Sequence, residues 1–126
     1  MSRPSKTPRR VGSFAVSPSG LLIGYKVMAW DPAARRLVSG ANRLIQLPLR
    51  RGVIHTMPGA GVFLAATDRY VLDHYAHHAV NALLAYEFDP RTITRGNLTD
   101  REPEIAVPSA KLLDYRLLDE DLYEVR

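Results

Sequence analysis

The sequence predicts a single compact α+β domain, with a largely antiparallel sheet and one main helix over about residues 68–80. The chain has 126 residues, 46% of them hydrophobic, which is enough for one core but not for two. Short apolar runs bounded by glycine or proline are typical of strands, and one segment has helical spacing. Strands on both sides of a single helix favour an antiparallel sheet.

The domain is expected to span residues 13–126, after a basic extended arm at residues 1–12. Pro4 and Pro8 disfavour both helix and sheet in this arm. We expect it to bind an acidic macromolecular surface, either nucleic acid or an acidic protein. Its basic residues are Arg3, Lys6, Arg9 and Arg10.

The distribution of charge offers an alternative partner for the arm. Residues 1–51 carry ten Lys or Arg and one acidic residue, whereas residues 52–126 carry seven and twelve. The arm could therefore dock on the acidic second half of its own chain, around Asp119 and Glu124.

Composition excludes several classes of protein. Without cysteine, the chain can form neither disulfides nor thiolate zinc sites. No run approaches the roughly 18 apolar residues of a membrane span, and "MSRPSKTPRR" lacks the apolar stretch of a secretory signal. We expect a cytoplasmic location or one within a virion.

Two apolar segments precede the helix. "GLLIGYKVMAW", residues 20–30, is predicted to be the first core strand, ended by the turn residues Asp31 and Pro32. Residues 35–52 indicate a hairpin or meander, in which Pro48 restricts its strand to an edge.

The next strand and the helix follow directly. "GVFLAA" is short, apolar and bounded by glycine, and helical spacing begins after it. Thr67 is suited to cap the helix, and Asp68 to lie near its positive end.

The C-terminal third contains the strongest strand pattern. "ALLAYEF" is predicted to be a central strand with Leu83, Leu84 and Tyr86 or Ala85 buried. A polar loop at residues 89–104 precedes "IAV". Residues 109–118 fit a helix through Leu113 and Leu117, but they also alternate as in a strand.

Three local motifs suggest chemistry. His74 and His78 are four residues apart and would share a helix face, but no third ligand follows, so we expect a solvated histidine face and no metal. The glycines of "PGAGVF" precede a strand, which favours a turn with positive φ over a phosphate loop. Glu102 and Glu104 would point to the same side of a strand and could hold a ribose hydroxyl.

Taken in order, these pieces resemble the ADP-ribosyltransferase superfamily, particularly its poly(ADP-ribose) polymerase branch. The resemblance covers roughly residues 22–118 and rests on "YKVMAW", "GAGVFLAATDRYVLDHY", "ALLAYEF", "EIAV" and "LLDYRLL". It implies an ADP-ribosyltransferase-like fold, strands over residues 109–118, and NAD as the cofactor. Small uncharacterised phage and bacterial domains share a similar layout.

The resemblance also implies roles for individual residues. Glu104 would be catalytic, with Glu102 beside it as in arginine-modifying members, and Lys26, Phe63 and Tyr75 would bind the cofactor. Lys26 stands where the family has His or Arg, and Phe63 where it has Tyr. Lys cannot reproduce bidentate hydrogen bonding, and Phe keeps the aromatic face without the hydroxyl.

Two functions therefore remain open. The first is an ADP-ribosyltransferase-like domain that binds NAD or a related nucleotide and could transfer ADP-ribose to a macromolecule. The second is a non-catalytic component of a phage particle or nucleoprotein assembly, anchored by its basic arm. Whether the chain is an enzyme stays open, because fold does not guarantee activity.

Overall fold

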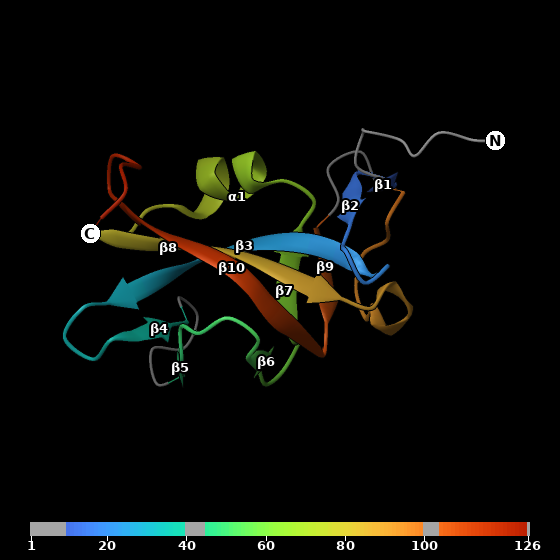
Figure 1. Ribbon diagram of the computed structural model, residues 1–126, viewed down its shortest axis with the longest axis horizontal. Coiled ribbons are helices and arrows are strands. Elements are labelled where there is room, and N and C mark those ends of the chain that lie inside the picture. The colour runs from blue at the N-terminus through green and yellow to red at the C-terminus, as the bar shows by residue number, and fades with distance from the viewer. Residues whose placement is uncertain (1–9, 40–44, 100–103, 126) are drawn as a thin grey trace.

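A computed structural model of the protein describes residues 10–39, 45–99 and 104–125. In these residues one α-helix lies on one side of the long strands β3, β8 and β10, and β4, β5 and β6 lie on the other side in the view of Figure 1. The strands are β1 (Arg10–Val11), β2 (Phe14–Val16), β3 (Leu22–Asp31), β4 (Arg36–Val38), β5 (Gln46–Leu47), β6 (Ile54–Thr56), β7 (Val62–Ala65), β8 (Val80–Phe88), β9 (Glu104–Val107) and β10 (Ser109–Asp119). The helices are α1 (Asp68–Tyr75) and the 3-10 helix η1 (Pro90–Thr92).

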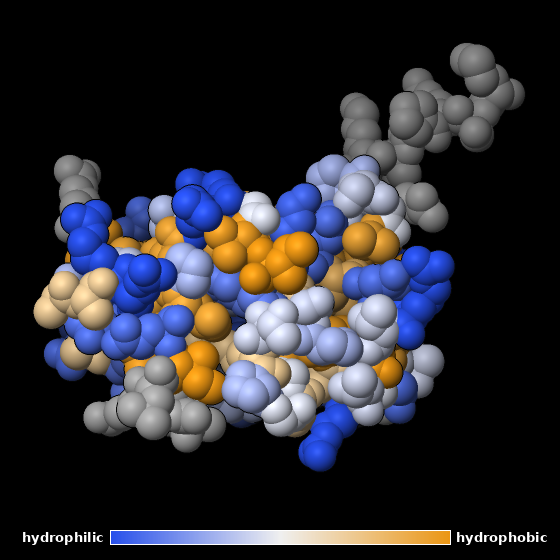
Figure 2. Space-filling view, turned by 90° about the horizontal axis from the view of Figure 1, so that it is seen from below, coloured by the Kyte–Doolittle hydropathy of each residue, from blue (hydrophilic) through white to orange (hydrophobic). Residues whose placement is uncertain are grey.

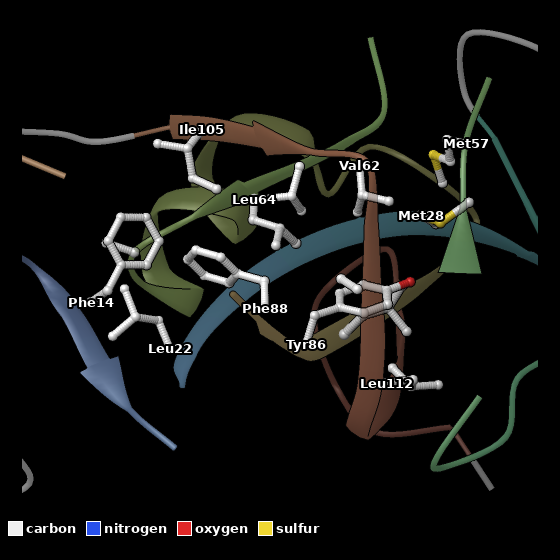
Figure 3. Packing of buried hydrophobic residues seen from close by; sticks show 14 of the residues in the cluster. Phe14, Leu22, Met28, Met57, Val62, Leu64, Tyr86, Phe88, Ile105 and Leu112 are labelled. Atoms are coloured by element: carbon white, nitrogen blue, oxygen red, sulfur yellow. The ribbon is translucent and has the colours of Figure 1, made fainter. Parts of the chain in front are cut away.

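Strand β8 is central, as predicted. It pairs antiparallel with β3 on one edge and with β10 on the other. Leu84 and Tyr86 are fully buried in the larger hydrophobic cluster, and Leu83 is buried in a smaller cluster that includes Val71 of α1. Both faces of β8 are therefore covered, which explains why its sequence is apolar almost throughout. Figure 3 shows Tyr86 packed among the side chains of the larger cluster.

Strand β3 changes partners along its second edge. This edge pairs with β2 at Leu22 and Ile23, with β7 at Tyr25 only, and with β4 from Ala29 onward. No described strand pairs with this edge at residues 26–28. The sheet therefore has a gap between β7 and β4, and the candidate site lies there.

The helix is shorter than predicted. We expected it to extend over about residues 68–80, but it ends at Tyr75. The Asn81 side chain accepts a hydrogen bond from the backbone N–H of His78 and donates one to the carbonyl of the same residue. This turn leads the chain directly into β8. The start of the helix is as predicted, since Thr67 Oγ1 accepts from the Tyr70 N–H at 3.2 Å.

Residues 109–118 belong to a strand, which resolves the ambiguity in their spacing. Strand β10 pairs with β8 over most of its length and with β6 at its start. The register shifts between Leu112 and Asp114, which is a bulge in the ladder. One extra residue at this point of β10 shifts the alternation of inward-facing and outward-facing side chains. The shifted pattern of apolar residues resembles helical spacing.

The predicted fold class is wrong. Strands make up 50% of the structure and helices 10%, so the domain has a sheet-rich fold and not the expected α+β, ADP-ribosyltransferase-like one. The expected antiparallel sheet and single main helix are present, but that helix has only eight residues. Several strands of two or three residues enlarge the sheet, and segments this short leave little periodicity in a sequence.

The arm predicted for residues 1–12 falls mostly outside the described residues, and so do Arg3, Lys6 and Arg9. Arg10 and Val11 form β1, which pairs with β2, and Arg10 Nη1 donates to the Ser13 carbonyl at 2.9 Å. The extended segment therefore joins the sheet at its last residues.

The surface carries no continuous apolar face in the view of Figure 2, where hydrophobic side chains lie in separate patches among hydrophilic ones. No helix in the described part of the chain has the length and apolar character needed to cross a membrane.

His55 of β6 is a buried polar residue that the sequence analysis missed. It is 1% exposed, and Nε2 donates to the Pro48 carbonyl at 2.9 Å while Nδ1 accepts from Tyr86 Oη at 2.6 Å. Both ring nitrogens are therefore satisfied in the neutral form. Burial lowers the pKa of His55, and the hydrogen bond to Pro48 opposes this effect.

This histidine should make stability depend on pH. Because the folded pKa lies below the unfolded value of about 6.5, the unfolded chain binds more protons, and stability falls as the pH drops through this window. Urea unfolding between about pH 7 and 5 should show this slope, and His55→Gln should flatten it. The carboxylates with lowered pKa, including Glu87 and Asp114, lose their contribution to stability only when they are protonated, which happens at lower pH. Wild-type stability that stays constant or increases on acidification to pH 5 would contradict the assignment.

Candidate ligand-binding site

A pocket of about 740 Å³ lies at the gap in the second edge of β3. Its walls come from β3, β7, β9, the end of α1 and the loop before β7. Val27 and Val71 in its lining belong to the smaller core cluster, whereas Met28 and Met57 belong to the larger one. The pocket therefore reaches the cores on both faces of the sheet.

Four of the five predicted site residues line this pocket. They are Lys26 of β3, Phe63 of β7, Tyr75 of α1 and Glu104 of β9. The fifth, Glu102, lies outside the described residues. Pairing of β7 with both neighbours brings three of these elements together, since Tyr25 pairs with Ala65 and Ala65 pairs with Glu104.

Two tyrosines of α1 hold the carboxylate of Glu104. Tyr75 Oη lies 2.9 Å from Oε1 and 2.8 Å from Oε2, and Tyr70 Oη donates to Oε2 at 3.3 Å. Burial, followed by the hydrogen bond to Glu104, raises the pKa of Tyr75 to about 12. Tyr75 therefore remains a hydrogen-bond donor at neutral pH, and Glu104 presents an oriented carboxylate to the pocket.

Aromatic rings continue along the same face of α1. The His74 ring stacks on Tyr70, with centroids 4.1 Å apart and an interplanar angle of 24°. Tyr75 meets Tyr70 edge-on at 6.4 Å. These contacts fix the orientation of Tyr70 and Tyr75, the two residues that bind Glu104.

The histidines do not form a metal site in the described part of the chain, where no group of three or more His, Asp or Glu side chains could hold an ion. The helix ends at Tyr75, so His78 does not share a helix face with His74. His74 Nδ1 instead lies 2.8 Å from the Tyr70 carbonyl, and His77 Nε2 lies 3.1 Å from the His74 carbonyl. All three histidines still line the pocket.

Lys26 is a basic residue at the centre of a strand that is otherwise mostly apolar. It lies on the same face of β3 as Gly24 and Met28. Burial lowers the pKa of its amine, and the negative charge of Glu104 opposes this effect. No described residue forms a hydrogen bond or an ion pair with the amine.

The glycine-rich loop before β7 forms one wall of the pocket. Gly59 and Gly61 have φ of 77° and 93°, which confirms the predicted positive φ. A Cβ on Gly61 would collide with the Val107 carbonyl, so this glycine also permits close contact with β9.

A second hollow of about 620 Å³, lined by Arg95 among others, lies against the same loop.

Sequence reasoning missed several residues of the site. Tyr70 could have been recognised as a partner of Glu104, because it lies on the helix that carries Tyr75. Tyr25, Met28 and Met57 also line the pocket. The pocket lies where β3 passes from β7 to β4, and no local sequence pattern marks that point.

Comparisons with protein-family models, with curated proteins and with solved structures find no match.

Proposed function

We propose that this protein binds NAD or a related nucleotide in the pocket beside β3. The observation that supports the proposal is the position of Lys26, Phe63, Tyr75 and Glu104, which come from four different elements and line one pocket. The proposal does not depend on an ADP-ribosyltransferase fold, because chemistry is determined by the site rather than by the fold.

The lining supplies the kinds of group that a nucleotide requires. The Glu104 carboxylate has acceptor capacity beyond its tyrosine partners and can accept hydrogen bonds from ribose hydroxyls. Phe63 offers an aromatic face to a planar base or to nicotinamide. Lys26 and the three histidines are the basic side chains of the lining and could bind a pyrophosphate, and Gly59 and Gly61, which have no side chain, would allow a ligand to approach the backbone closely. A volume of about 740 Å³ lies within the range of roughly 300–1,000 Å³ for ligand sites.

The same arrangement would suit ADP-ribose transfer. As nicotinamide leaves, positive charge develops on the ribose, and a fixed carboxylate stabilises it without reorganising. Glu104 would have this role, with Tyr70 and Tyr75 holding its orientation.

Calorimetric titration with NAD and with ADP-ribose tests the proposal. Wild-type protein should give saturable heat, and Phe63→Leu should weaken binding by roughly 2- to 12-fold, which corresponds to the 0.5–1.5 kcal/mol of an aromatic contact. Tyr123→Leu is the matched control, because Tyr123 is 73% exposed and does not line the pocket. No heat at millimolar nucleotide, or equal weakening in both variants, would refute nucleotide binding.

A further inference from the structure

Lys26 is placed differently from the other lysine that the structure describes. The chain has three lysines, Lys6, Lys26 and Lys111. Lys111 is exposed on β10, near the carboxylate of Glu87, and Lys6 lies outside the described residues. Lys26 lines the pocket and is only partly accessible. A buried lysine is normally paired with an acid, and this one has no ion pair among the described residues.

The amine of Lys26 is nevertheless accessible. Every fully buried side-chain nitrogen or oxygen in the described chain has a hydrogen-bond partner. Because Lys26 Nζ has no such partner among the described residues, it keeps some accessible surface. An amine that lines a pocket without a bound carboxylate is free to approach a ligand.

Burial raises the fraction of the Lys26 amine that is neutral, and the same pocket contains a carboxylate that can accept a proton. Burial lowers the pKa of Lys26, and only the neutral amine is a nucleophile. Glu104 lines the same pocket and is held by Tyr75. The other titratable side chains in the lining are Tyr25, His74, His77 and His78.

We propose that Lys26 is an amine nucleophile that binds aldehydes entering this pocket as imines. Nζ attacks the carbonyl carbon and forms a C–N bond, the carbonyl oxygen takes a proton, and the nitrogen loses one to give a carbinolamine. The hydroxyl then takes a second proton, the C–O bond breaks as water leaves, and the nitrogen loses its second proton, so amine and aldehyde give imine and water without an oxidant or reductant. Glu104 accepts the proton that the nitrogen loses and returns one to the leaving hydroxyl. Phe63 and the apolar lining accommodate an aromatic aldehyde.

Reductive labelling with benzaldehyde and cyanoborohydride tests this role, because cyanoborohydride converts each imine to a stable amine. In native protein at pH 7, peptide mapping by mass spectrometry should show Lys26 labelled severalfold faster than Lys111, because the lowered pKa of Lys26 raises the fraction of its amine that is neutral and the pocket holds the aldehyde beside it. Equal rates at the two lysines, or faster labelling of Lys111, would overturn the proposal.

Matched variants identify the reactive amine. Lys26→Met should remove the label from the peptide that contains residue 26, and Lys111→Met should leave the label on Lys26 in place. A second measurement on wild-type protein does not depend on the folding of any variant: in concentrated urea the preference for Lys26 should disappear. A preference that persists in urea would trace the reactivity to local sequence and would refute a role for the pocket. The inference is independent of nucleotide binding, because the labelling experiment contains no nucleotide.

Discussion

Replacing Leu84 by alanine is expected to lower the free energy of unfolding by about 2–5 kcal/mol, because deletion of a buried leucine side chain loses transfer free energy and leaves a cavity. Leu84 is fully buried at the centre of β8, between the ladders to β3 and β10. Backbone on both sides is fixed by hydrogen bonds, so the surrounding chain cannot easily collapse into the space, and we expect a value in the upper half of this range. Urea-induced unfolding measures the change.

The control for this substitution is Leu122→Ala. Leu122 is 40% exposed and lies beyond the last strand, so its removal should change stability by no more than about 0.5 kcal/mol. Similar losses for the two variants would show that β8 does not lie at the centre of the core.

Replacing Glu104 by glutamine is expected to weaken NAD binding by roughly 10- to 100-fold, the effect of losing hydrogen bonds of about 1.5–3 kcal/mol to a charged group. Any ADP-ribose transfer or NAD hydrolysis should be lost, because the amide cannot stabilise positive charge on the ribose. Glutamine keeps the shape of the side chain, and its carbonyl can still accept from Tyr75. The fold should therefore persist, which circular dichroism and thermal unfolding would check.

Glu120→Gln is the matched control, since Glu120 is exposed and does not line the pocket. It removes the same charge and should leave affinity unchanged. If both variants weaken NAD binding equally, the effect of Glu104 arises from net charge and not from the site.

The long strands of the fold could be predicted from sequence because their burial is continuous. Leu83, Leu84 and Tyr86 form part of an apolar run in β8, and "GLLIGYKVMAW" gives a similar signal for β3. Smaller features were harder to predict. The helix was expected to extend to about residue 80 but ends at Tyr75. The bulge between Leu112 and Asp114 made residues 109–118 fit a helix as well as a strand, and only the family resemblance favoured the strand that the structure has.

The candidate site was predictable only in part. Glu104 stands out locally because it begins a strand, whereas Tyr75, on the helix, was expected at the site only through the family resemblance. Their hydrogen bond joins residues 29 positions apart, and Lys26 comes from a third region of the chain. The gap that makes room for a ligand arises where β3 passes from β7 to β4, which is a property of long-range pairing. No local sequence pattern indicates this gap.

Binding of NAD beside β3 is tested most directly by a titration of isotope-labelled protein with NAD, followed by heteronuclear NMR. The account predicts that resonances of Lys26, Phe63, Tyr75 and Glu104 shift along one common saturation curve, while those of residues 120–125 stay in place. Absence of shifts at millimolar NAD, or shifts confined to residues outside the pocket, would contradict it.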